Sequence, residues 1–234
     1  MTDTELSGPS NPSAPRALLL LGQSPEQARQ FHNQPEHWAH LAACLRAAEL
    51  SARTITDDLS VLNSLDLSPY DVILNYSTGL TATDVQIDAL LDAVYNGAGY
   101  VGLHAATVTF TQHPRYLAMI GARFQRHDPI KRFTIHFTDI THPIAQGLHE
   151  YEHEDELYEL TGDYENPKNL LPIVTPDSGI QVLAEAEGHP MVYVKQHGVG
   201  RVAYLASGHD ARSLSHPTYR TLFTRAITWA ARRA

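Results

Sequence analysis

The chain has 234 residues, of which 43% are hydrophobic and 18% are charged, which is enough to bury one substantial core. Its formal net charge is -9, from 26 acidic and 17 basic residues. This excess of acid disfavours nucleic acid and anionic membranes as partners, because both require a basic surface. The longest apolar run, Ala17–Leu21, is far shorter than the roughly 18 residues of a membrane span. We therefore expect a soluble protein with a small-molecule ligand.

The first 15 residues, MTDTELSGPSNPSAP, lack the basic start and apolar core of a secretory signal, and their composition predicts a disordered tail. Cys44 is the single cysteine, so the chain cannot form an internal disulfide, which agrees with a reducing compartment. We expect a cytoplasmic protein with a tail at 1–15 and one domain at 16–234.

The first half of the domain alternates strands and helices. Continuous apolar runs predict strands at 16–22 and 70–76, with a weaker one at 51–56. Between the first two, Trp38, Leu41, Leu45 and Ala48 recur at helical spacing, which predicts a helix over 35–50.

The pattern continues with a helix to about residue 96, capped by Thr81 or Thr83, and a strand at 99–107. In the second half, 131–137 alternates like a half-exposed strand, and 190–196 and 201–206 flank a turn as an antiparallel hairpin. A final helix spans 217–231. The order predicts an α/β domain whose sheet is mostly parallel, has helices on both faces and carries an antiparallel hairpin in its second half.

Polar residues follow two of these strands, and ligands of open parallel sheets bind beyond the carboxyl ends of strands. His104 follows one strand, and Ser207–Asp210 (Ser-Gly-His-Asp) follows another. His209 and His104 could therefore converge on one cleft. A hydrogen-bonded interior histidine is the alternative interpretation of each.

The segment Gly102–Ala106 (Gly-Leu-His-Ala-Ala) resembles a nucleophile elbow, in which a sharp turn after a strand pushes one side chain into the cleft. The residue at its apex is His104, which can act as base, acid or metal ligand but is a poor stable acyl acceptor compared with Cys or Ser.

The acidic segment 150–159 contains six carboxylates in ten residues, and most of such a run is expected to be solvated surface. Asp155–Tyr158 mixes acids with apolar residues, so one carboxylate is a candidate to turn inward toward a sugar hydroxyl, a metal or His209. Histidine and carboxylate ligands suit zinc or another divalent ion, although no metal-binding spacing is present. His127 is expected in a loop, where a surface histidine is common.

Seven segments occur in a characteristic order: Asp71–Leu74, Gly99–Ala106, Gly121–Phe124 with His127, His142–Leu148, Asp155–Tyr158, Gly200–Asp210 and Ala226–Ala230. Together they resemble the ThuA-like (trehalose utilization) family of the class I glutamine amidotransferase-like superfamily. The resemblance implies a flavodoxin-like three-layer α/β sandwich and a role with trehalose, related disaccharides or their keto derivatives. It also implies that His104 stands where true amidotransferases carry their nucleophilic cysteine, so glutamine hydrolysis is not expected.

The leading hypothesis is a carbohydrate-acting protein with His104, His209 and Asp210 as catalytic residues. Glu156, Tyr158 and His127 would contact the substrate, and His104, His209 and Glu156 are the candidate ligands of a divalent metal such as zinc. Two alternatives stay open. One is a non-catalytic sugar-binding or complex-forming subunit, with an oxidoreductase as a candidate partner; the other is a metal-dependent hydrolase. A homo-oligomer is compatible with either.

Overall fold

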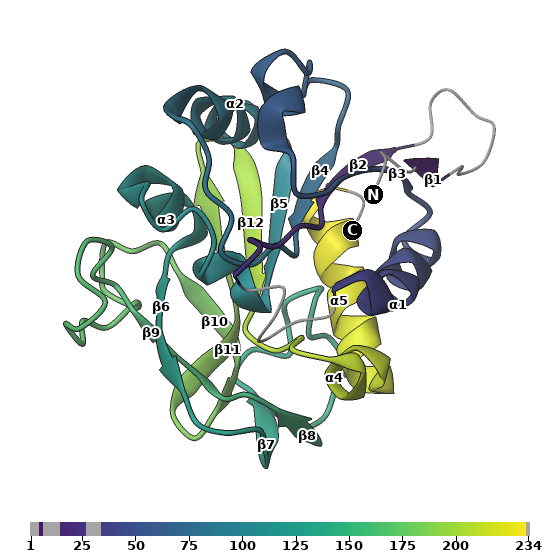
Figure 1. Ribbon diagram of the computed structural model, residues 1–234. Coiled ribbons are helices and arrows are strands. Elements are labelled where there is room, and N and C mark those ends of the chain that lie inside the picture. The colour runs from purple at the N-terminus through teal and green to yellow at the C-terminus, as the bar shows by residue number, and fades with distance from the viewer. Residues whose placement is uncertain (1–4, 7–14, 27–33, 233–234) are drawn as a thin grey trace.

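The computed structural model describes residues 5–6, 15–26 and 34–232. A ten-stranded sheet crosses the domain, with helices on both of its faces (Figure 1). The parallel centre of this sheet explains the continuous apolar runs of the sequence, because strands covered on both faces need no polar side. Its strands lie side by side in the order β3 (Ser51–Ile55), β2 (Arg16–Leu20), β4 (Val72–Asn75), β5 (Gly99–Leu103) and β12 (Gly200–Leu205).

Beyond β12 the sheet becomes antiparallel. The predicted hairpin is confirmed, because β11 and β12 pair with Gln196 opposite Arg201. The sheet then extends further than the sequence indicated, and a separate two-stranded sheet stands beside it. The antiparallel strands are β11 (His189–His197), β10 (Gln181–Ala186), β7 (Lys131–Phe137) and β8 (Tyr151–Asp155), and the small sheet consists of β6 (Arg123–His127) and β9 (Tyr158–Thr161).

Helices complete a three-layer sandwich (Figure 1). On one face, α5 packs on β4, β5 and β12, and α1 packs against α4 and α5. On the other face, α2 packs against α3 and η2. Their bounds are α1 (Gln34–Ala47), α4 (Ala211–Ser215), α5 (Pro217–Ala230), α2 (Asp84–Tyr95), α3 (Pro114–Ile120) and η2 (Leu59–Asn63). None of the helices among the described residues is long and apolar enough to cross a membrane.

The predicted tail lies mostly outside the described residues. Within it, Glu5–Leu6 form β1, which pairs antiparallel with β3, so these two residues belong to the sheet. The prediction for the rest of residues 1–14 stays a prediction.

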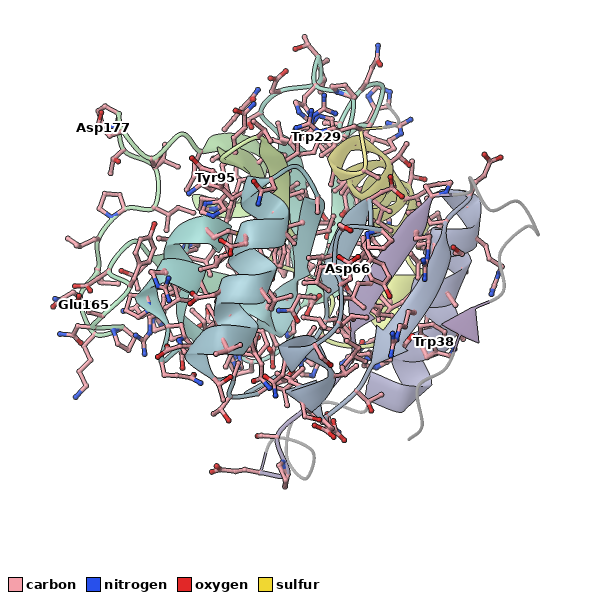
Figure 2. All side chains as sticks on the ribbon, turned by 90° about the horizontal axis from the view of Figure 1, so that it is seen from above. Trp38, Asp66, Tyr95, Glu165, Asp177 and Trp229 are labelled. Carbon is pink, nitrogen blue, oxygen red and sulfur yellow. The ribbon has the colours of Figure 1, made fainter. Side chains whose placement is uncertain are left out.

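A long irregular segment joins β9 to β10 over residues 162–180. Figure 2 shows Glu165 and Asp177 of this segment at the outer edge of the molecule. Leu170 and Leu171 are exposed at 70% and 52%, so the segment carries apolar side chains in contact with solvent.

Candidate functional site

The site begins where two neighbouring strands of the parallel centre end. β5 and β12 are paired with Leu103 opposite Leu205, so the residues that follow them emerge side by side. His104 comes directly after β5 and opens a short 3-10 turn, His104–Thr107. Its φ of 44° is in the left-handed region, which few non-glycine residues adopt. The predicted elbow is therefore present, and its apex is a histidine.

Hydrogen bonds hold the elbow and determine which nitrogen of the His104 imidazole carries a proton. The Tyr204 hydroxyl donates to the backbone carbonyl of His104 at 2.8 Å. The Nδ1 atom of His104 lies 2.9 Å from the carbonyl oxygen of Ala206, which can only accept, so Nδ1 carries a proton. In the neutral ring this leaves the lone pair on Nε2, where the Tyr158 hydroxyl lies at 3.0 Å. In histidines that bind metals, the ring nitrogen that does not bind the metal typically donates to a backbone carbonyl, as Nδ1 does here.

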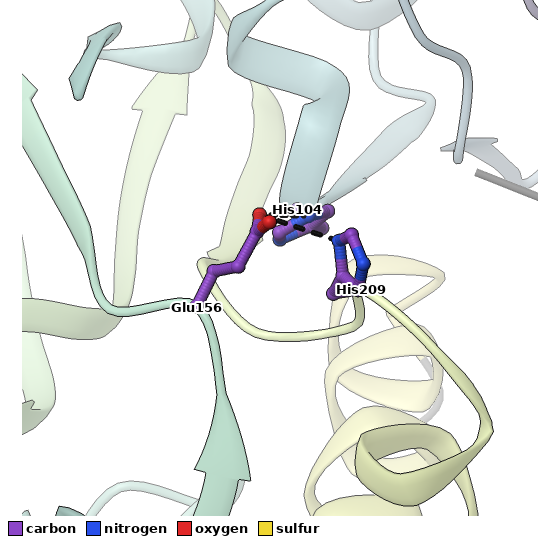
Figure 3. A group of neighbouring side chains, drawn as sticks. All are labelled: His104, Glu156 and His209. Carbon is purple, nitrogen blue, oxygen red and sulfur yellow. Dashed lines mark ion pairs between the residues drawn. The ribbon is translucent and has the colours of Figure 1, made fainter. Parts of the chain in front are cut away.

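Two further side chains meet His104 at this nitrogen (Figure 3). Glu156 comes from the turn between β8 and β9, and His209 follows β12. One carboxylate oxygen of Glu156, Oε2, lies 3.4 Å from Nε2 of His104 and 3.3 Å from Nδ1 of His209. The donor atoms of all three residues lie within 4.8 Å of one another. His104 and Glu156 are buried, and His209 is partly exposed.

These separations suit a shared ion. A charge-assisted hydrogen bond between nitrogen and carboxylate usually spans about 2.7–2.9 Å, and both contacts of Glu156 exceed this. Two ligands of a tetrahedral zinc with bonds of about 2.0–2.1 Å stand about 3.3–3.4 Å apart. Two imidazoles and one carboxylate are also a donor set that zinc uses in catalytic sites. The residues therefore fit a divalent ion of the zinc class.

Without an ion, the carboxylate of Glu156 lies between two imidazoles. Burial raises the pKa of Glu156, but the hydrogen bonds and charges of His104 and His209 outweigh it and hold that pKa far below its usual range. Burial lowers the pKa of His209, while the neighbouring carboxylate of Glu156 raises it, and the net shift is upward. An ionised Glu156 is the state that a cation would require.

His127 and Tyr158 flank this group, and their predicted contact with substrate stays a prediction. Nε2 of His127 lies 3.6 Å from the second oxygen of Glu156, Oε1, and its ring stacks on that of Tyr158. The expected loop position of His127 is wrong, because it is the last residue of β6. This strand pairs only with β9 in a two-stranded sheet, so it lacks the apolar alternation that would have revealed it.

Asp210 has contacts that its expected role did not include. Its carboxylate caps α4 by accepting from the backbone amide of Arg212 at 2.8 Å, and it also binds the guanidinium of Arg212 at 3.0 Å. It does not belong to the group of three donors found among the described residues. Burial raises the pKa of Asp210, but the hydrogen bonds and charge of Arg212 outweigh burial and the net shift is downward, so the carboxylate is ionised near neutral pH.

The acidic segment has both exposed and buried carboxylates, and two of them, instead of the expected one, are buried. Glu150 and Glu152 are exposed, whereas Glu156 and Asp155 are buried. Burial raises the pKa of Asp155, but hydrogen bonds led by that of His153 lower it to about 2. Asp155 is therefore a second inward carboxylate, adjacent to the first.

Two other residues beside the site, His37 and Tyr76, were not predicted from the sequence. The Tyr76 hydroxyl donates to the carbonyl of Gly208 at 2.7 Å, and because its one proton is used there, Nδ1 of His37 donates to it at 2.7 Å. Burial lowers the pKa of His37 to about 4, so its ring is neutral near neutral pH. A single histidine on an amphipathic helix carries no signal that separates it from a surface residue.

Comparison with known proteins agrees with this architecture. The model of the ThuA family, described as trehalose utilisation, matches residues 22–230. The chain belongs to the ThuA family. Among curated proteins, none matches the chain.

Solved structures extend the likeness of this ThuA-family chain at the level of the fold. A ThuA-like protein from Parabacteroides merdae is 20% identical with a TM-score of 0.77, covering 94% of this chain and 90% of its own. A ThuA-like protein from Bacteroides uniformis is also 20% identical with a TM-score of 0.71, covering 96% of this chain and 95% of its own. A GMP synthase component from Thermoplasma acidophilum is 13% identical with a TM-score of 0.55, covering 95% of this chain and 96% of its own. At these identities the likeness shows a shared fold.

Proposed function

We propose that this ThuA-family protein is an enzyme acting on a carbohydrate of the trehalose or keto-sugar class, with a divalent ion of the zinc class held by His104, Glu156 and His209. The observation that carries the proposal is the distance of two imidazole nitrogens, of His104 and His209, from Oε2 of Glu156. The family description, trehalose utilisation, supports trehalose as the substrate class, and keto derivatives of such sugars are included because the site suits proton transfer beside a carbonyl. A cytoplasmic location is part of the proposal.

The residues of the chain have separate tasks in this reaction. His104 and Glu156 are buried and fixed, so they suit binding and orientation. His209 is partly exposed, so it would hold the ion on the side that solvent and substrate reach. His127, whose Nε2 lies beside Oε1 of Glu156 and is not one of the three ligands, suits proton transfer at a hydroxyl or at a carbon next to a carbonyl. When bound, a divalent ion would polarise that oxygen and lower the barrier to loss of the proton.

Hydrolysis by the same site is a second candidate, because two histidines and one carboxylate leave a coordination position open for water. The two reactions differ in their products. A hydrolase cleaves a disaccharide into two sugars, whereas proton transfer at a keto-sugar exchanges a carbon-bound proton with solvent.

Zinc titration by calorimetry and a panel of trehalose, related disaccharides and their keto derivatives test the proposal. We expect one ion per chain and turnover of at least one sugar, with both lost in His104→Ala and Glu156→Gln. Glu150→Gln, an exposed member of the same acidic segment, is the matched control and should behave like the wild type. Sugar binding without turnover, unchanged by His104→Ala, would identify a binding subunit instead.

The same site makes glutamine hydrolysis an unexpected activity. His104 occupies the apex of the elbow, and an imidazole does not form the stable acyl intermediate that glutaminase chemistry requires. We expect no glutamate release from glutamine above the rate of a heat-inactivated sample. Release that disappears in His104→Ala would contradict this expectation.

A further inference from the structure

We infer that Asp155 is a positioning residue that sets the distance between Glu156 and His209. This inference rests on the proposed function, because it concerns how the three donors are brought to the spacing of an ion site. Asp155 was not among the residues that the sequence indicated for catalysis or binding. Its carboxylate accepts from backbone amides beside the donors, so its action is through the backbone.

One carboxylate connects the two segments that carry the ligands. Oδ1 of Asp155 accepts from the backbone amide of Glu156 at 2.7 Å, and Oδ2 accepts from the amide of Gly208 at 2.7 Å. The amide of His209 lies at 3.4 Å from the same Oδ2. The turn between β8 and β9 and the segment after β12 are thereby joined at the residues beside the ligands.

Other contacts hold the segment after β12 but do not join it to Glu156. The hydroxyl of Tyr76 donates to the carbonyl of Gly208, and that of Tyr219 donates to the carbonyl of Ser207, each at 2.7 Å. Gly208 has a φ of 128°, a conformation that residues with side chains rarely adopt. The position of His209 therefore depends on a backbone turn that is bound on both sides, and Asp155 supplies the side facing Glu156.

Asp155 is buried, so water cannot replace its carboxylate oxygens as acceptors for the two amides. Its side chain is 0% exposed. Behind it, Nε2 of His153 lies 2.9 Å from Oγ of Ser213 and 3.7 Å from Oδ2 of Asp155. An asparagine would offer one acceptor oxygen for two amides, so one of the two segments would lose its bond.

Asp155→Asn tests the inference in the full-length protein. We expect the zinc dissociation constant to rise about 10- to 100-fold, as is usual when a group that orients metal ligands is removed. The visible absorption of the Co²⁺-loaded protein should also change, because the ligand geometry changes. A role in stability alone would lower the melting temperature but leave both properties of the folded protein as they are.

Asp163→Asn is the matched control. The Asp163 carboxylate also accepts from two backbone amides, of Glu165 at 3.0 Å and Asn166 at 2.8 Å, but it is in the irregular segment outside the site. It should keep the zinc affinity and the Co²⁺ spectrum of the wild type. If Asp155→Asn does not fold, Asp155→Ser, which is smaller and retains one acceptor, serves for the same measurements.

The amide proton of Gly208 gives a readout that needs no ion. In nuclear magnetic resonance spectra, we expect it to be protected from exchange in the wild type and to lose that protection in Asp155→Asn or Asp155→Ser. Failure of the wild type to bind zinc would overturn the proposed metal site, and this amide would still decide the role of Asp155. A folded variant with unchanged Gly208 protection, or with zinc affinity within twofold of the wild type, would overturn the inference.

Discussion

At the scale of single residues, the elbow depends on Gly102 as much as on His104. A Cβ atom on Gly102 would lie 2.8 Å from Cδ1 of Ile120 and 3.2 Å from Cβ of Ala106, which lies within the 3-10 turn. A methyl group at this position would therefore force the end of the Ile120 side chain to shift and would crowd Ala106. Without a side chain, Gly102 lets the turn that begins at His104 pack closely on the strand.

Gly102→Ala should lower the free energy of unfolding by about 1–3 kcal/mol through overpacking, measured by urea titration. It should also weaken zinc binding, because the displaced Ala106 lies two residues from the imidazole. In Gly179→Ala the new Cβ meets open space, although its φ of 65° is left-handed. That control should lose stability without losing zinc affinity. A Gly102→Ala protein with wild-type stability would show that α3 can move aside.

The sequence indicated the donors of the site better than their supports. His104, His209 and Glu156 were identified because a strand end or an inward carboxylate gave each a local signal. Asp155 and His37 were not, because their roles depend on contacts with Gly208 and Tyr76, far away in the chain. Contacts between segments that are distant in the chain cannot be predicted from local sequence patterns.

At the scale of elements, the N-terminus of α2 shows how the structure decides between two candidate caps. Thr83, not Thr81, is the cap, and it forms a reciprocal pair with Gln86. The side chain of Thr83 accepts from the amide of Gln86 at 3.4 Å, and Oε1 of Gln86 accepts from the amide of Thr83 at 2.9 Å. The helix therefore begins at Asp84 with two of its free amides satisfied.

Thr83→Ala should reduce the free energy of unfolding by about 1 kcal/mol, because the amide of Gln86 loses its acceptor. Thr81→Ala, an exposed position two residues earlier, should stay within about 0.5 kcal/mol of the wild type. Chemical denaturation of both variants checks the pair. Equal losses would mean that helix capping does not limit stability here.

The elements that the sequence missed share a physical cause. In β8, the inward residues are His153 and Asp155 and the outward ones include Glu152 and Glu154, so polar residues occupy both faces. The side chains alternate between buried and exposed positions, but their hydrophobicity does not alternate, so the sequence of this strand resembles that of a charged loop. The strands of the parallel centre were predicted because burial on both faces leaves an unambiguous apolar run.

At the scale of the whole molecule, stability should depend on pH through His37. Its pKa is about 4 in the folded state against 6.5 for the ordinary group. Between these values the unfolded chain binds more protons than the folded chain, so the free energy of unfolding falls as the pH drops from 6.5 toward 4. The full effect is at most about 3 kcal/mol, with about 2 kcal/mol lost by pH 5.

Urea titrations at about pH 7 and pH 5 measure this dependence. His37→Gln retains a donor for Tyr76 but cannot titrate, so its stability should change less between the two conditions. His149→Gln, at an exposed position, should keep the wild-type difference. If His37→Gln loses as much stability on acidification as the wild type, other groups carry the pH dependence.

The order of strands makes ligand binding depend on the whole folded domain. β12 comes after β10 and β11 in the chain, yet it stands between β5 and β11 in the sheet, and Glu156 comes from the antiparallel half. A ligand that engages His104, Glu156 and His209 together thus binds only the completed domain. At 100 times its dissociation constant it would add about 2.7 kcal/mol to the stability of the whole fold. Proteases act on the open chain, so saturation with that ligand should slow proteolysis of the protein.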